Sequence, residues 1–256
     1  MDADLRVNAL YLSSHLRSRL ADAARCPVTT IIAPTGYGKT TAAQYLQRRI
    51  AAEVPDAYLF RQFLSGGGRQ EFWAGLCRAL HTAPQLSAQL RALGYPDSPH
   101  TRQQLLELVQ DALAGKPPVW FILDDVHLLS GGEAAELVSF LAERLPPQAH
   151  LILLSRNQIF SEAQKLRLGS RLLELGAADL RLTQEELAQY AGLCGLPLPE
   201  RESQALLSVS EGWIAMVYLI FRAYAQTGTW RFDTKGMDTL IEQVMFEPLP
   251  ERQRLF

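Results

Sequence analysis

One short segment, Ala33 to Thr41, constrains this chain more than any other part of its sequence. It reads Ala-Pro-Thr-Gly-Tyr-Gly-Lys-Thr-Thr, follows an apolar run over Val28–Ile32 and precedes a helix-like stretch over Thr40–Ile50. A strand, a glycine-containing turn and a helix in this order direct backbone N–H groups at a phosphate, and the N-terminus of the helix adds partial positive charge. The segment therefore predicts a phosphate-binding loop.

Individual residues of this loop have distinct expected roles. Lys39 is expected to bridge the β- and γ-oxygens of a nucleoside triphosphate, and the Thr40 hydroxyl to ligate Mg²⁺. Gly36 and Gly38 supply the backbone freedom that the curl demands, and Ala33 stands where the pattern usually has its first glycine. The predicted nucleotide-binding residues of the loop are Ala33, Gly36, Tyr37, Gly38, Lys39, Thr40 and Thr41.

Composition limits the classes of function. The chain has 256 residues, of which 48% are hydrophobic and 20% charged, which allows one large α/β domain and a smaller one. Its net charge of −2 gives no electrostatic basis for nucleic-acid binding by this segment. Cys26, Cys77 and Cys194 are widely spaced and read as reduced thiols. No apolar run is long enough to span a bilayer and no signal-peptide pattern is present, so we expect no membrane partner and a cytoplasmic location.

Short apolar runs alternate with amphipathic helical patterns through the first two thirds of the chain. This alternation predicts an α/β fold in which a parallel sheet is covered by helices on both faces, over residues 1–182. Together with the phosphate-binding loop, it is the three-layer arrangement expected of a P-loop NTPase. The predicted strands are Val28–Ile32, Ala57–Phe60, Val119–Leu123, His150–Leu154 and Leu172–Leu175.

The pattern becomes purely helical after Leu182. Thr183 to Glu186 form a capping box, with Leu182 and Leu187 placed as a hydrophobic staple, and another helix is expected to start near Ser210–Trp213. We predict a small all-helical domain over residues 183–235. Residues 236–256 are expected to begin a further, winged-helix-like domain that the chain does not complete.

A second set of polar residues follows two of the predicted strands. The strand Val119–Leu123 ends in Asp124 and Asp125, and ligands of such sheets lie beyond the carboxyl ends of the strands. We expect Asp124 to hold Mg²⁺ together with Thr40, and Asp125 to orient or deprotonate the attacking water; the alternative is an aspartate that caps the next segment. Arg156 follows a later strand as a candidate γ-phosphate sensor, the alternative being a surface arginine. His127 is left out of the catalytic set.

Longer stretches resemble a known family. APTGYGKTTAAQYL, FWAGLCRAL, WFILDDVHLL, LLSRN, LLELGAADLRLTQEELAQYAGL and SEGWIAMVYLI are similar to segments of the STAND NTPases, specifically the MalT-like, large LuxR-type transcriptional regulators. The resemblance covers nearly all of the chain. It implies phosphate and Mg²⁺ binding by Lys39 and Thr40, an acidic pair formed by Asp124 and Asp125, and a sensor at Arg156. It also implies that the turn at Glu211–Trp213 packs toward the nucleotide.

The same resemblance implies a switch, in which ADP holds a closed resting form and an inducer with ATP favours an open form that self-associates. In this chain Ser13-Ser14-His15 replaces the Arg-Pro-Arg-like segment of many relatives. The chain ends where relatives begin a winged-helix domain, so we expect a fragment. We expect DNA to be bound only through a C-terminal region that is absent from this chain.

Three functions fit these residues. The leading hypothesis is an ATP/ADP-binding regulatory module that hydrolyses ATP slowly; the second is a nucleotide-binding interaction module without significant turnover. The third, a small-molecule kinase, is less favoured because we find no arginine-rich lid. An arginine finger from a neighbouring subunit would fit an oligomer, but the sequence does not single one out.

Overall fold

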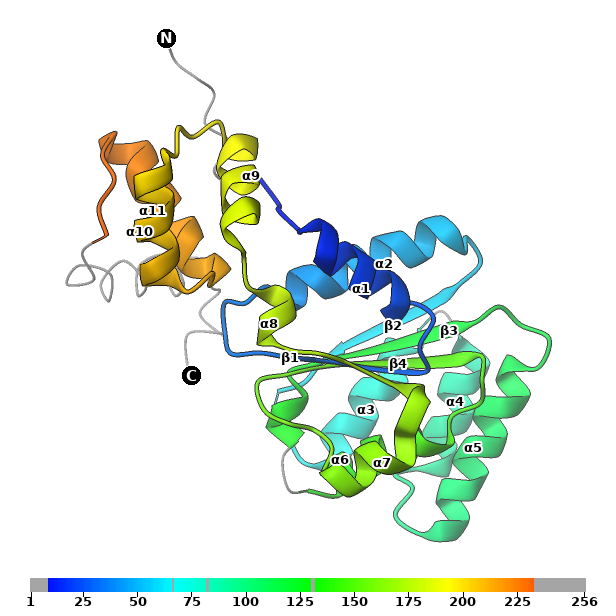
Figure 1. Cartoon of the computed structure of the whole chain (residues 1–256). Helices are drawn as coiled ribbons and strands as arrows, with labels where there is room; N and C mark the ends of the chain where they lie inside the picture. The colour runs from blue at the N-terminus through cyan, green and yellow to red at the C-terminus, as the bar shows by residue number, and fades with distance from the viewer. Residues whose placement is uncertain (1–8, 66, 82, 130–131, 233–256) are drawn as a thin grey trace. The chain divides into compact units, whose positions relative to one another are not determined.

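The computed structural model describes residues 9–65, 67–81, 83–129 and 132–232 (Figure 1). The chain divides into two compact units. One, termed the sheet unit, lies within residues 14–35 and 39–179; the other, termed the helical unit, includes the described residues 9–13, 36–38 and 180–232. The predicted extra domain over 236–256 lies outside the described residues.

The sheet unit is built on five parallel strands in the order β2-β3-β4-β1-β5. The strands are β1 Val28–Ile32, β2 Tyr58–Phe63, β3 Val119–Asp124, β4 Ala149–Ser155 and β5 Leu172–Leu175. The helices of this unit are α1 Ser14–Ala23, α2 Lys39–Glu53, α3 Arg69–Ala79, α4 Pro84–Leu93, α5 Pro99–Leu113, α6 Glu133–Arg144 and α7 Glu162–Leu168, with α8 Ala177–Leu180 at its boundary.

Helices cover both faces of this sheet, as predicted. Figure 1 shows α1 and α2 on one face and α3 to α7 on the other. The central strand β4 is buried along its whole length, because a parallel strand with helices on both sides has no solvent-facing side. The predicted α/β three-layer fold is confirmed.

The predicted strands all occur, β3 and β4 extend one residue beyond their predicted ends, and β2 differs most. The strand expected over Ala57–Phe60 runs from Tyr58 to Phe63. Arg61 and Gln62 broke the apolar run on which the prediction rested, although both are paired in the sheet, opposite Ile122 and Leu123 of β3. The strand stays extended here because its polar residues find partners inside the protein.

The helical unit contains α9 Gln184–Cys194, α10 Glu200–Ser210 and α11 Ile214–Thr227. The Thr183 hydroxyl accepts from the Glu186 N–H at 3.3 Å and the Glu186 carboxylate accepts from the Thr183 N–H at 2.9 Å, so the expected capping box is present. The segment Ser210–Trp213 is the turn between α10 and α11, and α10 itself had not been predicted. Leu187, Leu206, Val217 and Phe221 are fully buried and form much of this unit's core.

Candidate nucleotide-binding site

The phosphate-binding loop connects β1 to α2, as the sequence predicts. Gly36 and Gly38 have φ angles of +79° and +84°, which L-residues with a side chain rarely adopt. The N–H of Ala33 donates to the carbonyl of Ser155 at 3.2 Å and so ties the start of the loop to the end of β4. Thr41, also in the predicted set, is half-buried in the first turn of α2.

Lys39 is buried and satisfied by the loop itself. Its ammonium donates to the carbonyls of Ala33 at 2.7 Å and of Pro34 at 3.0 Å. Burial lowers the pKa of Lys39, the negative charge of Asp125 acts against that shift, and the positive charge of Arg156 adds to it. The ammonium therefore lies among loop groups, where an anionic phosphate would be a stronger partner than neutral carbonyls.

The acidic pair lies at the carboxyl end of β3. Asp124 is 2% exposed. Its Oδ2 accepts from the Thr40 hydroxyl at 3.3 Å and its Oδ1 from the Asp125 N–H at 3.1 Å. Thr40 and Asp124, which the sequence places 84 positions apart, are thus neighbours. They form a pair of hard oxygen donors of the kind that Mg²⁺ takes from proteins.

Asp125 has an unusual backbone. Its φ is +60°, one of two positive values among the described residues other than glycine. An aspartate in this region costs about 1 kcal/mol or more. Its side chain is 41% exposed, and its Oδ1 lies 3.8 Å from Nδ1 of His127. The turn thereby separates the two carboxylates into a buried one and an accessible one.

Arg156 follows directly after β4, the strand that lies between β1 and β3. Its side chain is exposed, and its charge lowers the pKa of both Lys39 and His127. For His127 burial is the larger cause, and the charge of Asp125 opposes it. Arg156 is therefore within electrostatic reach of the loop lysine and of the acidic turn.

The tip of the loop, Gly36–Gly38, belongs to the helical unit, together with residues 180–232. Within that unit the Tyr37 ring stacks on Trp213 with centroids 6.3 Å apart, and the Arg181 guanidinium lies 6.0 Å from the Tyr37 centroid. A Cβ on Gly36 would lie 2.7 Å from Nε1 of Trp213. Gly36 is thus required both by its φ and by the closeness of an indole.

Sequence reasoning missed Arg61. Its Nη2 donates to Oδ2 of Asp124 at 2.7 Å, the same oxygen that accepts from Thr40. The predicted second strand stopped at Phe60, so Arg61 fell outside it and was not placed in the sheet. The sequence did hold one signal: Phe63 lies two residues after Arg61, and residues two apart on a strand share a face. A strand extended to Phe63 would therefore have placed Arg61 and Phe63 on the same side of the sheet.

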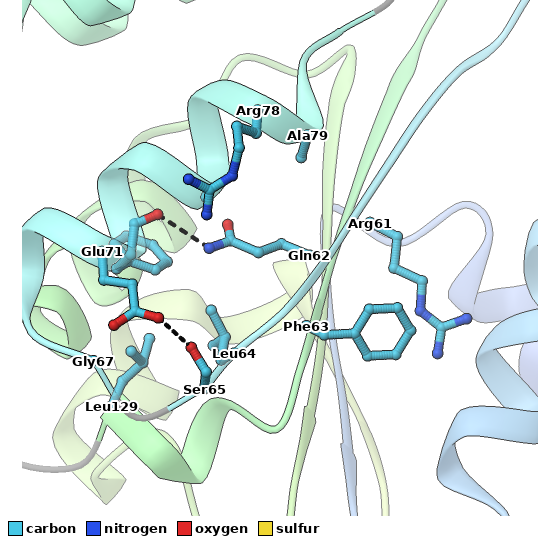
Figure 2. Close-up of a pocket in the computed structure, with 12 residues that line it drawn as sticks. Arg61, Gln62, Phe63, Leu64, Ser65, Gly67, Glu71, Arg78, Ala79 and Leu129 are labelled. Atoms are coloured by element: carbon cyan, nitrogen blue, oxygen red, sulfur yellow. Dashed lines mark hydrogen bonds between the residues drawn. The ribbon is translucent and has the colours of Figure 1, made fainter. Parts of the chain in front are cut away.

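A polar pocket of about 360 Å³ lies at the end of β2 and is lined by residues of β2, α3 and the segment between them. In Figure 2 Gln62 points toward α3 while Arg61 and Phe63 project to the other side. Gln62 donates to the carbonyl of Phe72 at 3.0 Å, and Ser65 to Glu71 at 2.6 Å. A Cβ on Gly75 would lie 2.2 Å from the Gln62 amide nitrogen. These residues are held by one another and not by the predicted phosphate site.

Comparisons with known proteins agree with this architecture. The family model described as the AAA domain matches residues 22–155, more than half of the chain. The HTH-type transcriptional regulator MalT of Serratia proteamaculans is 27% identical over 232 residues, which cover 88% of this chain and 25% of that protein. The chain thus spans about a quarter of the length of the curated relatives it matches.

Solved structures share the fold. A Walker-type ATPase of Pyrococcus abyssi superposes with a TM-score of 0.60 at 13% identity and covers 100% of this chain and 79% of its own. A signal transduction ATPase with numerous domains, which carries a tetratricopeptide repeat sensor and comes from Pyrococcus horikoshii, gives a TM-score of 0.57 at 18% identity over 94% of this chain and 33% of its own. Among the described residues no helix is long and apolar enough to cross a membrane. This chain belongs to the AAA domain family and is a P-loop NTPase module related to MalT.

Proposed function

We propose that this chain is the ATP- and ADP-binding switch module of a signal-responsive transcriptional regulator, and that it hydrolyses ATP slowly. The observation that carries the proposal is the convergence of Lys39, Thr40 and Asp124 at the carboxyl ends of β1 and β3, with Thr40 hydrogen-bonded to Asp124. The similarity to a transcriptional regulator and to a signal transduction ATPase supports the regulatory part.

Each residue has a role in this proposal. Lys39 would turn its ammonium from the carbonyls of Ala33 and Pro34 to the β- and γ-phosphates. Thr40 and Asp124 would hold Mg²⁺, which when bound offsets negative charge on the phosphates. Asp125 would orient water, and Arg156 would read the γ-phosphate through its guanidinium.

Slow turnover is expected from the acidic turn. Asp125 has a shorter side chain than the glutamate that many fast ATPases use, and its φ of +60° fixes the direction in which the carboxylate projects. General-base catalysis needs hydrogen-bond reach to the water, and a small displacement weakens it. DNA binding and inducer recognition would belong to parts of the protein beyond the matched quarter of its relatives.

A nucleotide-binding assay tests the first half of the proposal. Lys39→Ala should weaken ATP affinity at least about tenfold, because a charge-assisted contact is lost. Lys116→Ala, which removes an exposed lysine next to α5, should leave the affinity unchanged. Equal ATP affinity in the wild type and Lys39→Ala would contradict the proposal.

The alternative is a nucleotide-binding interaction module without significant turnover. It is favoured by Asp124, whose carboxylate already accepts three hydrogen bonds from protein groups. Single-turnover measurements separate the two functions. Turnover in the wild type that collapses in Asp125→Asn, while ATP still binds, supports the slow ATPase; no turnover in either protein supports the interaction module.

A further inference from the structure

Arg61 lies on the face of the sheet that carries Asp124. In the parallel register of β2 and β3, Phe63 pairs with Asp124 and Arg61 with Ile122. Residues two apart on a strand share a face, and paired residues of neighbouring strands do too. Arg61, Phe63 and Asp124 therefore project to one side, and Figure 2 shows Arg61 and Phe63 on the side away from Gln62.

The guanidinium is fixed there by several contacts. Nη2 donates to Oδ2 of Asp124 at 2.7 Å and Nη1 to Oε1 of Gln47, on α2, at 3.1 Å. The Phe63 ring lies 4.5 Å from Cζ and adds a cation–π contact. The side chains of Arg61 and Asp124 are 12% and 3% exposed, so the pair is largely shielded from water.

Burial makes the loss of either partner of this ion pair costly. A buried carboxylate that loses its cationic partner is left uncompensated, which costs far more than the loss of a surface pair. Oδ2 of Asp124 accepts from both Thr40 and Arg61. A magnesium ion at Oδ2 would have to share this oxygen with Thr40 and Arg61 or displace them, because Mg²⁺ binds carboxylate oxygens at short distance in a near-octahedral shell.

A guanidinium at hydrogen-bond distance and a divalent cation repel each other strongly at one partly buried oxygen. We propose that Arg61 is the resident counter-ion of Asp124 and competes with Mg²⁺ for it. This inference rests on the proposed function only in assigning Mg²⁺ to Asp124. It adds that the protein holds nucleotide with little help from the metal until the Arg61–Asp124 pair opens.

Two titrations of the intact chain test the competition. In the first, a fluorescent ATP analogue is bound in excess EDTA and then titrated with Mg²⁺. In the second, Mn²⁺ is titrated into the nucleotide-free protein and free Mn²⁺ is read by electron paramagnetic resonance. Arg61→Gln should lower the half-saturating metal concentration about tenfold or more in both titrations, because the competing charge is gone.

Three variants keep this result interpretable. Arg61→Lys retains the cation and should behave like the wild type. Gln47→Leu removes the second anchor of the guanidinium without touching Asp124, so it should shift the half-saturation in the same direction as Arg61→Gln but less, even if Arg61→Gln folds poorly. Arg49→Gln removes the partner of Glu53 in a surface ion pair on α2 and should change nothing.

The outcomes separate this inference from the proposed function. If no protein binds the ATP analogue, the proposed function fails, and the nucleotide-free Mn²⁺ titration still decides the competition. Unchanged metal affinity in both Arg61→Gln and Gln47→Leu would overturn the inference. Weaker metal binding in Arg61→Gln would overturn it too, since it would mean that Arg61 helps to build the metal site.

Discussion

His150 shows how a single residue can couple this fold to pH. It lies on β4, nearly buried, with its ring stacked on Trp120 at a centroid distance of 4.7 Å. Its Nδ1 lies 3.0 Å from the carbonyl of Cys26, and because a carbonyl only accepts, Nδ1 carries the proton of the neutral ring. Burial lowers the pKa of His150, and the hydrogen bond to Cys26 opposes the shift only in part.

The lowered pKa gives a stability prediction. Below about pH 6.5 the unfolded chain binds a proton at this histidine that the folded protein resists, so the free energy of unfolding should fall as pH falls. His150→Asn, which can still donate to Cys26, should flatten this slope by up to about 1.4 kcal/mol per pH unit. Urea unfolding from about pH 5 to about pH 8, the range in which histidine titrates, measures this slope.

An exposed histidine provides the control. His81→Asn should leave the slope as it is in the wild type. Part of the slope that remains in His150→Asn is expected from His127, whose pKa burial also lowers. A wild-type slope that survives His150→Asn in full would contradict the assignment.

At the residue scale, a site residue is easier to predict when the residues that define its role are close to it in the sequence. Lys39 and Thr40 could be predicted as phosphate and Mg²⁺ ligands because the loop is contiguous and its pattern is tied to one geometry. Asp124 could be assigned because it follows an apolar strand. Alternation with Phe63 indicates which face Arg61 occupies, but it does not indicate the pairing with Asp124, because that pairing depends on the strand order that places β2 beside β3.

At the scale of elements, the strands and helices were found wherever apolar periodicity is continuous. The strands β1 and β5 have the predicted bounds. The helix α10 was missed because its buried positions include Ser203 and Ser210, which do not register as an apolar stripe. Tertiary packing buries these serines, and a periodicity based on hydrophobicity cannot anticipate it.

The turn between α10 and α11 makes a prediction of its own. Gly212 has a φ of +74°, and its carbonyl accepts from the Leu182 N–H at 2.9 Å. A Cβ there would lie 2.4 Å from the Leu182 carbonyl oxygen, which is backbone and cannot turn away. Gly212→Ala should therefore lower the free energy of unfolding by about 2–4 kcal/mol, measured by urea unfolding with circular dichroism.

Gly192 is the matched control for this substitution. It lies in α9 of the same unit, and a Cβ there meets nothing within 4 Å. Gly192→Ala should be neutral or stabilise the protein by up to about 1 kcal/mol through helix propensity. If both variants unfold at the same urea concentration as the wild type, the turn does not constrain the residue at position 212.

At the scale of the whole molecule, a nucleotide acts as a switch only through a difference in affinity. A ligand that binds two conformations with equal affinity does not change the equilibrium between them, however tightly it binds. The proposed function therefore requires ADP and ATP to favour different conformations of this chain. Its near-neutral net charge of −2 leaves little long-range repulsion to oppose self-association of one of those conformations.

This requirement gives the last prediction. With Mg²⁺ present, ADP should bind at least about tenfold more tightly than a non-hydrolysable ATP analogue, a difference of about 1.4 kcal/mol that would hold the resting form. Calorimetry gives both affinities, and sedimentation velocity at several protein concentrations shows whether the ATP analogue alone increases the mass. Lys39→Ala should weaken the binding of both nucleotides, because both lose the contact to the β-phosphate. Equal affinities together with equal sedimentation would mean that nucleotide binding does not switch this chain, because no free energy would then connect the phosphate loop to a change of conformation.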